Sequence, residues 1–273
     1  MTPRAQVTTV GPPPPAIQLL DPVGFEWTRV DLPVPNLPAA LAGLKIVHLT
    51  DLHLYRRWWR ALDDLIARVR DADPDLLLIT GDFVDDKRDH SYAVPMVQRL
   101  LCRLGPARLG TFAVLGNHDS VRLAPHLAGT PVKLIDGDRT TVTRDGATVE
   151  LIGLPGADRE LLEQAWLDAL PKRPANAVRV VLSHFPDQLL RIRQLEPDLV
   201  LAGHTHGGQC CLPTGRPIIT HDSLPKRYSK GVHWMNGTWL VVGRGFGFAS
   251  LRIRAFAPSQ VIELRLQPHV ARA

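Results

Sequence analysis

The chain has few cysteines, and they are poorly placed for disulfides. Its three cysteines are Cys102, Cys210 and Cys211. An odd count without framework spacing argues against a disulfide-stapled secreted fold. The adjacent pair is unsuited to bonding with itself, because vicinal disulfide geometry is strained. We therefore predict a reducing compartment, with Cys210 and Cys211 as buried small hydrophobes.

Long apolar runs are also missing. No stretch approaches the roughly 18 residues that a membrane helix needs. The first 15 residues are broken by prolines and lack the apolar core of a signal peptide. We expect a cytoplasmic protein, with peripheral membrane contact as an open alternative. The net charge of +5 suits an anionic substrate, but no long basic run appears, so no stable nucleic-acid partner is expected.

The 273 residues, 45% of them hydrophobic, suffice for one large domain. Residues 1–16 contain four consecutive prolines and predict a disordered tail, and residues 17–273 predict a single domain. An edge strand is expected near Glu26–Leu32.

Alternating strand and helix signals begin at residue 45. Apolar runs at 45–50, 75–80 and 109–115 predict strands, and helical spacing at 60–72 and 91–104 predicts helices between them. This order predicts right-handed parallel crossovers and an α/β fold. Further on, strands are expected at 136–144, 148–154, 178–182, 199–202, 239–243 and 260–266. Helices are expected at 158–169 and 187–195.

Five clusters of metal-binding or proton-transferring side chains follow or end these apolar runs. They are Asp51-Leu52-His53, Gly81-Asp82-Phe83-Val84-Asp85, Gly116-Asn117-His118-Asp119, Ser183-His184 and Gly203-His204-Thr205-His206. Ligand sites of open α/β sheets lie at the carboxyl ends of the strands, so these side chains are expected to meet there.

The residue types suit a pair of divalent cations, which two-metal hydrolytic sites hold roughly 3.5–4 Å apart. Asp51 and His53 are two positions apart beyond a strand, so both can face one metal. Asp82 is the candidate carboxylate between two cations, and Asn117 offers a neutral carbonyl oxygen. The histidines His184, His204 and His206 complete the set. With nitrogen and oxygen ligands and no thiolate, Mn, Fe, Co and Zn remain open.

The order and types of these clusters resemble the calcineurin-like metallophosphoesterases. Ser183-His184-Phe185-Pro186-Asp187, residues 203–209, Pro213 and residues 243–247 resemble its bacterial YaeI/YkuE-type phosphodiesterase branch. The resemblance covers about residues 25–266 and departs at Cys210-Cys211. It implies two packed mixed β-sheets flanked by helices.

The same resemblance implies roles by position. Asp51, His53, Asp82 and His206 would bind the first metal, and Asp82, Asn117, His184 and His204 the second, with Mn²⁺ most often the activator. His118 would protonate the leaving oxygen while a metal-bridging hydroxide attacks phosphorus. Asp85 would orient His118 and raise its pKa, and Asp119 would only support the loop.

The substrate is less constrained by the residues. The resemblance implies a phosphodiester or pyrophosphate, either a small molecule or a lipid-linked one such as UDP-diacylglucosamine. Arg244 is a candidate phosphate contact, with a solvated loop arginine as the alternative. Trp58 and Trp59 either contact a lipid headgroup, a membrane surface or a nucleotide, or pack inward at a helix start. Two other functions stay open: a non-catalytic metal-binding scaffold of the same fold, and a nuclease.

Overall fold

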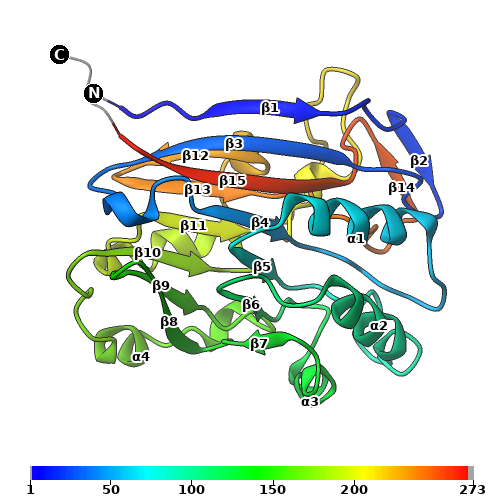
Figure 1. The fold of residues 1–273 in the computed structure, drawn as a ribbon. Coiled ribbons are helices and arrows are strands. Elements are labelled where there is room, and N and C mark those ends of the chain that lie inside the picture. The colour runs from blue at the N-terminus through cyan, green and yellow to red at the C-terminus, as the bar shows by residue number, and fades with distance from the viewer. Residues whose placement is uncertain (1, 270–273) are drawn as a thin grey trace.

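Two mixed β-sheets packed face to face form the centre of the protein (Figure 1). The computed structural model describes residues 2–269. The first sheet has the strand order β1–β3–β15–β4–β5–β6–β7 and the second has β12–β13–β11–β10–β9–β8. A separate pair is formed by β14 and β2. The predicted α/β fold of two packed mixed sheets flanked by helices is confirmed.

The elements have the following bounds. The strands are Gln6–Val10 (β1), Ile17–Leu19 (β2), Glu26–Val34 (β3), Lys45–Leu49 (β4), Leu76–Thr80 (β5), Gly110–Val114 (β6), Val132–Leu134 (β7), Asp138–Arg144 (β8), Ala147–Gly153 (β9), Ala177–Leu182 (β10), Leu199–Ala202 (β11), Gly231–Met235 (β12), Thr238–Val242 (β13), Ile253–Ala255 (β14) and Gln260–Pro268 (β15). The α-helices are Arg60–Ala72 (α1), Val94–Leu104 (α2), Ala124–Leu127 (α3) and Gln164–Ala169 (α4). Short 3-10 helices are Ala39–Leu41, Val121–Leu123, Arg159–Leu161, Pro186–Leu190, Arg193–Leu195, His206–Gly208 and Lys226–Tyr228.

Each sheet contains a run of four parallel strands, which reaches the edge strand β7 in the first sheet and lies in the middle of the second. In the first sheet β4, β5, β6 and β7 are parallel neighbours. In the second sheet β9, β10, β11 and β13 are parallel, and the antiparallel strands β8 and β12 lie at its edges. The loops that leave the carboxyl ends of neighbouring parallel strands therefore share one edge of each sheet.

Apolar side chains from both sheets fill the space between them. β4 contributes Ile46 and β5 contributes Leu78, and β10 and β11 of the other sheet contribute Val180 and Leu201. On the outer side of the first sheet, α1 and α2 bury their apolar faces in a second cluster. The predicted helix over 60–72 has these bounds because its apolar residues recur every three or four positions.

Several predictions of local structure were wrong. Residues 6–10 of the expected disordered tail form β1, which pairs antiparallel with β3. β3 is consequently an interior strand, between β1 and β15, and not an edge strand. The expected helix at 158–169 is a 3-10 helix followed by the short α4, and the one at 187–195 is two 3-10 helices. Within residues 2–269 there is no helix with the length and apolarity to cross a membrane.

Candidate metal centre

The five predicted clusters meet at the carboxyl ends of the parallel strands. β4, β5 and β6 lead into the loops that carry Asp51, Asp82 and Asn117. β10 and β11 of the other sheet lead to His184 and His204. Each sheet thus supplies part of one site, which explains why residues more than 150 positions apart in the chain come into contact.

The backbone of the site is strained. Asp51, His53, Asp82, His204 and His206 all have positive φ, between 42° and 66°. Each such residue costs of order 1–3 kcal/mol and persists only where the surrounding structure over-determines it. Five of the seven predicted ligands therefore have an unfavourable backbone conformation. Such conformations are retained where they direct side chains into a functional site.

Gly203 permits the close approach of the two sheets. A Cβ at this position would overlap Thr50 Oγ1 and Asp51 Oδ2. The missing side chain lets the His204 backbone N–H reach both oxygens of the Asp51 carboxylate, each at 3.1 Å. The glycine before the His-Thr-His segment is therefore a packing requirement of the site.

The first predicted ligand set forms one buried cluster. One ligand atom from each of Asp51, His53, Asp82 and His206 lies within 4.8 Å of the others. His53 Nε2 faces His206 Nε2 at 3.0 Å, His206 Nε2 lies 3.3 Å from Asp51 Oδ1, and His53 Nε2 lies 3.4 Å from Asp82 Oδ2. Imidazole nitrogens and carboxylate oxygens converging on one point fit a divalent cation.

The second predicted set converges around His184. Its Nε2 atom lies 3.0 Å from Asn117 Oδ1, 3.3 Å from Asp82 Oδ2 and 3.2 Å from His204 Nδ1. A single N–H cannot satisfy three such neighbours well, whereas a cation can. Asp82 belongs to both sets, as its predicted position between two metals requires.

Charge in the site is concentrated on the two carboxylates. Burial alone would raise the pKa values of Asp51 and Asp82, but His206 and His184 respectively hold them well below the usual range. Burial would lower the pKa of His184, yet Asp82 and Asp51 raise it to about 9. Burial lowers the pKa of His204 to about 3 and that of His206 to about 4, which keeps both imidazoles neutral. Neutral imidazoles and ionised carboxylates are the forms that bind metals, so His184 must lose its proton when a cation binds.

Asp119 supports the loop around Asp82. Its buried carboxylate accepts backbone N–H groups from Phe83 at 2.7 Å, Val84 at 3.2 Å and Gly116 at 2.8 Å. Burial, followed by the charge of Asp82, raises the pKa of Asp119 well above its ordinary value. This is the loop-supporting role that the sequence suggested for it.

The predicted partnership between the Asp85 carboxylate and His118 differs from the structure. His118 Nδ1 donates to the main-chain carbonyl of Asp85 at 2.6 Å. The Asp85 carboxylate lies 3.4 Å from His53 Nδ1 and accepts a hydrogen bond from Arg252 at 2.9 Å. Burial lowers the pKa of His118, although Asp82 opposes the shift, so the expected rise is reversed.

Arg244 does not face the cluster. Its guanidinium pairs with Glu26 on β3 at 2.9 Å, and its aliphatic stem packs where a Cβ on Gly207 would lie. It is absent from the lining of the cavity beside the metal cluster. The sequence showed an arginine between glycines but gave no sign of the ion pair that holds it.

Arg254 contacts the site, although no sequence motif indicates it. Its fully buried guanidinium donates to the carbonyls of Gly247 at 2.7 Å, Ala257 at 3.0 Å and Arg244 at 2.7 Å, and lies 3.0 Å from His206 Nδ1. Burial lowers its pKa to about 9, so it stays charged at neutral pH. A lone arginine in a short strand carries no sequence signal of this kind.

The tryptophans after the first motif pack inward. Trp59 is 5% exposed within the core that α1 and α2 cover. Trp58 donates its indole N–H to Asp63 at 3.0 Å and is stacked by Arg99. Of the two alternatives, packing at the start of a helix is the one the structure shows.

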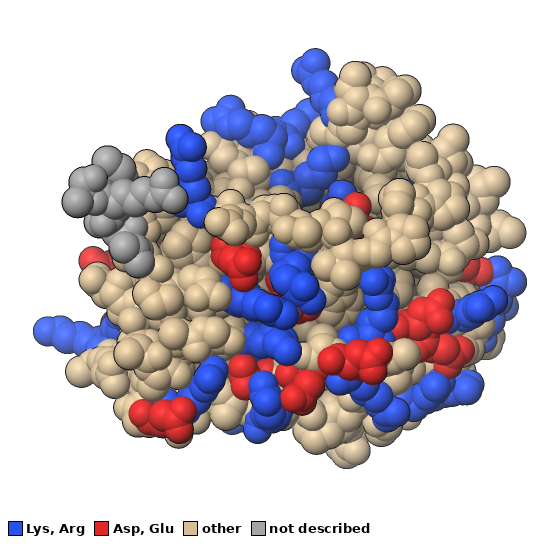
Figure 2. All heavy atoms as spheres, turned by 45° about the horizontal axis from the view of Figure 1, so that its top comes forward, with Lys and Arg blue, Asp and Glu red and all other residues tan. Residues whose placement is uncertain are grey.

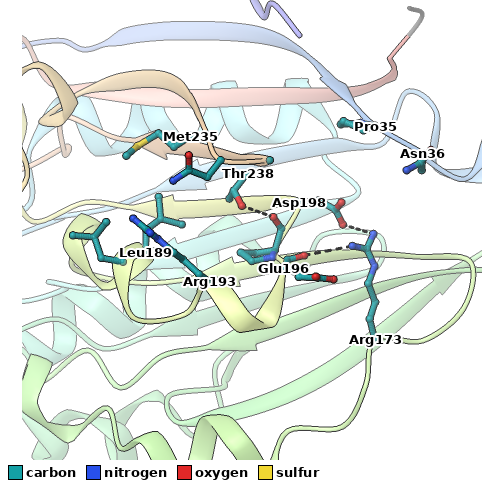
Figure 3. A pocket seen from close by; sticks show the side chains of 13 residues that line it. Pro35, Asn36, Arg173, Leu189, Arg193, Glu196, Asp198, Met235 and Thr238 are labelled. Carbon is teal, nitrogen blue, oxygen red and sulfur yellow. Dashed lines mark hydrogen bonds and ion pairs between the residues drawn. The ribbon is translucent and has the colours of Figure 1, made fainter. Parts of the chain in front are cut away.

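A cavity of about 520 Å³ opens beside the metal cluster. Its lining combines His118, Asn117 and His204 with Lys87 and with apolar residues that include Ile218, Ile219 and Leu251. A second cavity of the same volume lies before β11 and at the β12–β13 turn, at the opposite ends of the strands (Figure 3). Its lining includes Arg173, which pairs with Asp198. None of the predicted site residues lines this second cavity.

Comparison with known proteins agrees with this site. A family model described as calcineurin-like phosphoesterase matches residues 44–208. The chain is 29% identical over 260 residues to the uncharacterized metallophosphoesterase YkuE of Bacillus subtilis, covering 91% of this chain and 87% of YkuE. It is 34% identical over 235 residues to phosphodiesterase YaeI of Escherichia coli, covering 82% and 83%.

A third relative is the UDP-2,3-diacylglucosamine pyrophosphatase LpxG of Chlamydia muridarum, 28% identical over 308 residues and covering 90% of each chain. NAD nucleotidase of Haemophilus influenzae shares the fold with a TM-score of 0.51 at 16% identity, over 74% of this chain and 45% of that one. The chain belongs to the calcineurin-like phosphoesterase family, and its relatives include the bacterial branch that the motifs indicated. It is a metallophosphoesterase with a candidate metal-binding cluster.

Proposed function

We propose that this protein is a binuclear metal-dependent phosphodiesterase. The observation that carries the proposal is the position of the Asp82 carboxylate between the two ligand sets. Its Oδ2 atom lies 3.4 Å from His53 Nε2 on one side and 3.3 Å from His184 Nε2 on the other. A shared carboxylate is what two adjacent cations require.

The proposed ligands follow from the two clusters. Asp51, His53, Asp82 and His206 hold the first cation; Asp82, Asn117, His184 and His204 hold the second. We propose Mn²⁺ as the native metal, and Fe, Zn or Co also suit the nitrogen and oxygen donors. Bound cations supply Lewis acidity toward a phosphoryl oxygen and activate water.

His118 is the proposed general acid. Its Nδ1–H is held by the Asp85 carbonyl, which leaves Nε2 for the substrate, and the side chain lines the cavity beside the cluster. An anionic phosphoryl group placed there raises the pKa of the imidazole by favouring its charged form. The protonated ring can then deliver a proton to the leaving oxygen.

A phosphodiester or pyrophosphate is the proposed substrate, in preference to a monoester. Support comes from the relatives, one named a phosphodiesterase and one a UDP-2,3-diacylglucosamine pyrophosphatase. The cavity lining suits a substrate with a charged and an apolar part. Lys87 provides positive charge, while Ile218, Ile219 and Leu251 offer contact to an apolar group. A lipid-linked substrate would use both. A reducing, cytoplasmic compartment remains part of the proposal.

The proposal is tested with protein stripped of metal and assayed on bis-p-nitrophenyl phosphate and p-nitrophenyl phosphate. Mn²⁺, Fe²⁺, Zn²⁺, Co²⁺ and Mg²⁺ are added back in turn. We expect Mn²⁺ to restore diester cleavage well above monoester cleavage. Faster cleavage of the monoester would overturn the diesterase assignment, and the absence of restored activity with two bound cations would favour a scaffold.

A further inference from the structure

A small apolar sheet lies beside the candidate metal centre. In the antiparallel pair β2–β14, Ile17 is opposite Ala255 and Leu19 is opposite Ile253. Successive side chains of a strand point to opposite faces, and the central residues Gln18 and Arg254 are buried. The side chains of the two flanking pairs therefore share the outer side. Figure 1 shows β2 and β14 next to each other at one end of the molecule.

The outer side continues into the segment after the His-Thr-His motif. The backbone of Cys210 forms a parallel β-bridge with that of Ala255, and the Ile218 backbone N–H donates to the Cys210 carbonyl at 3.3 Å. Bridged residues project to the same side of a sheet. We call the outer side formed by Ile17, Leu19, Ile253, Ala255, Cys210 and Ile218 the docking face.

The docking face and its borders are unusually exposed for apolar residues. Leu19 is 60% exposed, Leu20 is 63% exposed and Ile218 is 52% exposed. Thirteen large hydrophobic residues are exposed within residues 2–269, and eight of them lie on this face or beside it: Ile17, Leu19, Leu20, Val23, Leu212, Ile218, Ile219 and Leu251. Such a concentration marks an interaction surface, because single exposed apolar residues are otherwise scattered.

The chain around the docking face is positively charged. Residues 199–262 contain seven Lys and Arg and one acidic residue, Asp222. Arg216, Lys226 and Arg227 are exposed, whereas Arg254 is buried and Arg244 and Arg252 are paired with Glu26 and Asp85. Asp21, which follows Leu20, is paired with Arg57. The Lys226 ammonium donates a hydrogen bond to the Ile218 carbonyl at 2.6 Å, and Arg216 is exposed on the adjoining turn. In Figure 2 the upper part of the visible face carries Lys and Arg among uncharged residues with little Asp or Glu, whereas the lower part mixes both signs. The complementary partner is therefore apolar and anionic.

We propose that this face docks on the surface of a lipid bilayer that contains anionic lipids. Aliphatic side chains enter the boundary between headgroups and acyl chains, and the surrounding cations contact lipid phosphates. Ile218, next to Ile219, also lines the cavity that holds His118, so docking places the mouth of the site at the membrane. The docking proposal is independent of the proposed function. The further step, in which an ester in the membrane reaches His118, rests on the proposed function.

The test is sedimentation of the full chain with vesicles of phosphatidylcholine, alone or mixed with phosphatidylglycerol. The test variant is Leu19→Ser with Leu20→Asn, because Leu20 has φ of 67°, which asparagine tolerates. The matched control is Leu161→Ser with Leu190→Ser, two exposed leucines away from the docking face.

We expect wild-type protein to bind the anionic vesicles and to be released by salt. The Leu19/Leu20 variant should bind at least about tenfold more weakly, since two apolar side chains no longer leave water. The control should bind as wild type does. Hydrolysis of bis-p-nitrophenyl phosphate in solution should be unchanged in both variants, which shows that they fold.

Wild-type protein that ignores anionic vesicles, or a Leu19/Leu20 variant that binds them equally well, would overturn the proposal. So would a wild-type dimer that this variant converts to monomers in light scattering, because a second copy would then cover the face. Vesicle binding without any diester hydrolysis would leave docking standing and remove the proposed function instead.

Discussion

His118 and Asp85 are joined through the main chain: the imidazole Nδ1–H donates to the Asp85 carbonyl at 2.6 Å. The orientation of His118 consequently does not depend on the Asp85 side chain. The carboxylate is left to contact His53 Nδ1 at 3.4 Å and Arg252 at 2.9 Å. One residue thereby positions both the proposed acid and a proposed metal ligand, by different atoms.

Replacing Asp85 should therefore act on the metal. In Asp85→Asn, we expect the affinity for Mn²⁺ to fall about 10–100-fold, because a carboxylate beside a ligating imidazole fixes its orientation and basicity. Excess Mn²⁺ should restore most of the turnover number. Titrating metal-free enzyme with Mn²⁺ and following diester cleavage measures this directly. A low turnover number at saturating metal would show that the carboxylate acts through His118 after all.

Replacing His118 should act on the proton. In His118→Asn, we expect kcat to fall about 10²–10⁴-fold while the metal content stays as in wild type. The loss should be larger for a diester with an alkyl leaving group than for one with p-nitrophenolate, which needs little protonation. Kinetics on both diesters, with metal analysis of the same preparation, separate this from loss of ligands. Equal losses on the two diesters would argue against a general acid.

Gly203 should tolerate no side chain. In Gly203→Ala the added methyl group would overlap Thr50 and the Asp51 carboxylate, so the loops of the two sheets must separate. We expect loss of metal binding and of activity. Gly24→Ala is the matched control, since its methyl group meets only Pro14 at 3.6 Å. Metal analysis of both variants decides the matter, and a metal-loaded Gly203→Ala protein would contradict the packing argument.

Arg254 should matter chiefly for stability. Arg254→Met leaves several buried carbonyls without a donor, each worth about 1–3 kcal/mol, so the free energy of unfolding should fall by roughly 2–4 kcal/mol. In Arg103→Gln, which breaks a half-exposed ion pair with Asp63, the change should stay below about 1 kcal/mol. Urea unfolding monitored by circular dichroism compares them. Similar midpoints for the two variants would contradict the role assigned to Arg254.

The clusters that form the site could be located from the sequence because each cluster is a short motif directly after, or at the end of, an apolar run. Asp51, Asp82 and His204 each follow a short apolar run, and the carboxyl ends of neighbouring parallel strands meet at one edge of a sheet. Helix α1 was equally predictable, since the spacing of Leu62, Leu65 and Val69 is a property of the segment itself.

What the sequence did not show depends on contacts between distant segments. β1 is short and lies between Pro3 and the four prolines at 12–15, and it becomes a strand because it pairs with β3. Arg244 turns toward Glu26, and the Asp85 carboxylate toward His53 and Arg252, because those partners are close in space only. Trp59 packs inward because α1 and α2 enclose it. Neither the pairing of β1, nor these ion pairs, nor the burial of Trp59 is indicated by a pattern in the neighbouring sequence.

The most direct test of the account is the number of cations bound per chain. Metal-free protein is dialysed against Mn²⁺ and analysed by mass spectrometry of the metal, for wild type and for Asp82→Asn. Because Asp82 contacts ligands of both sets, we expect two Mn²⁺ ions per wild-type chain and at most one in Asp82→Asn. A wild-type chain that binds one ion or none, or an Asp82→Asn chain that keeps two, would contradict a binuclear centre built around this carboxylate.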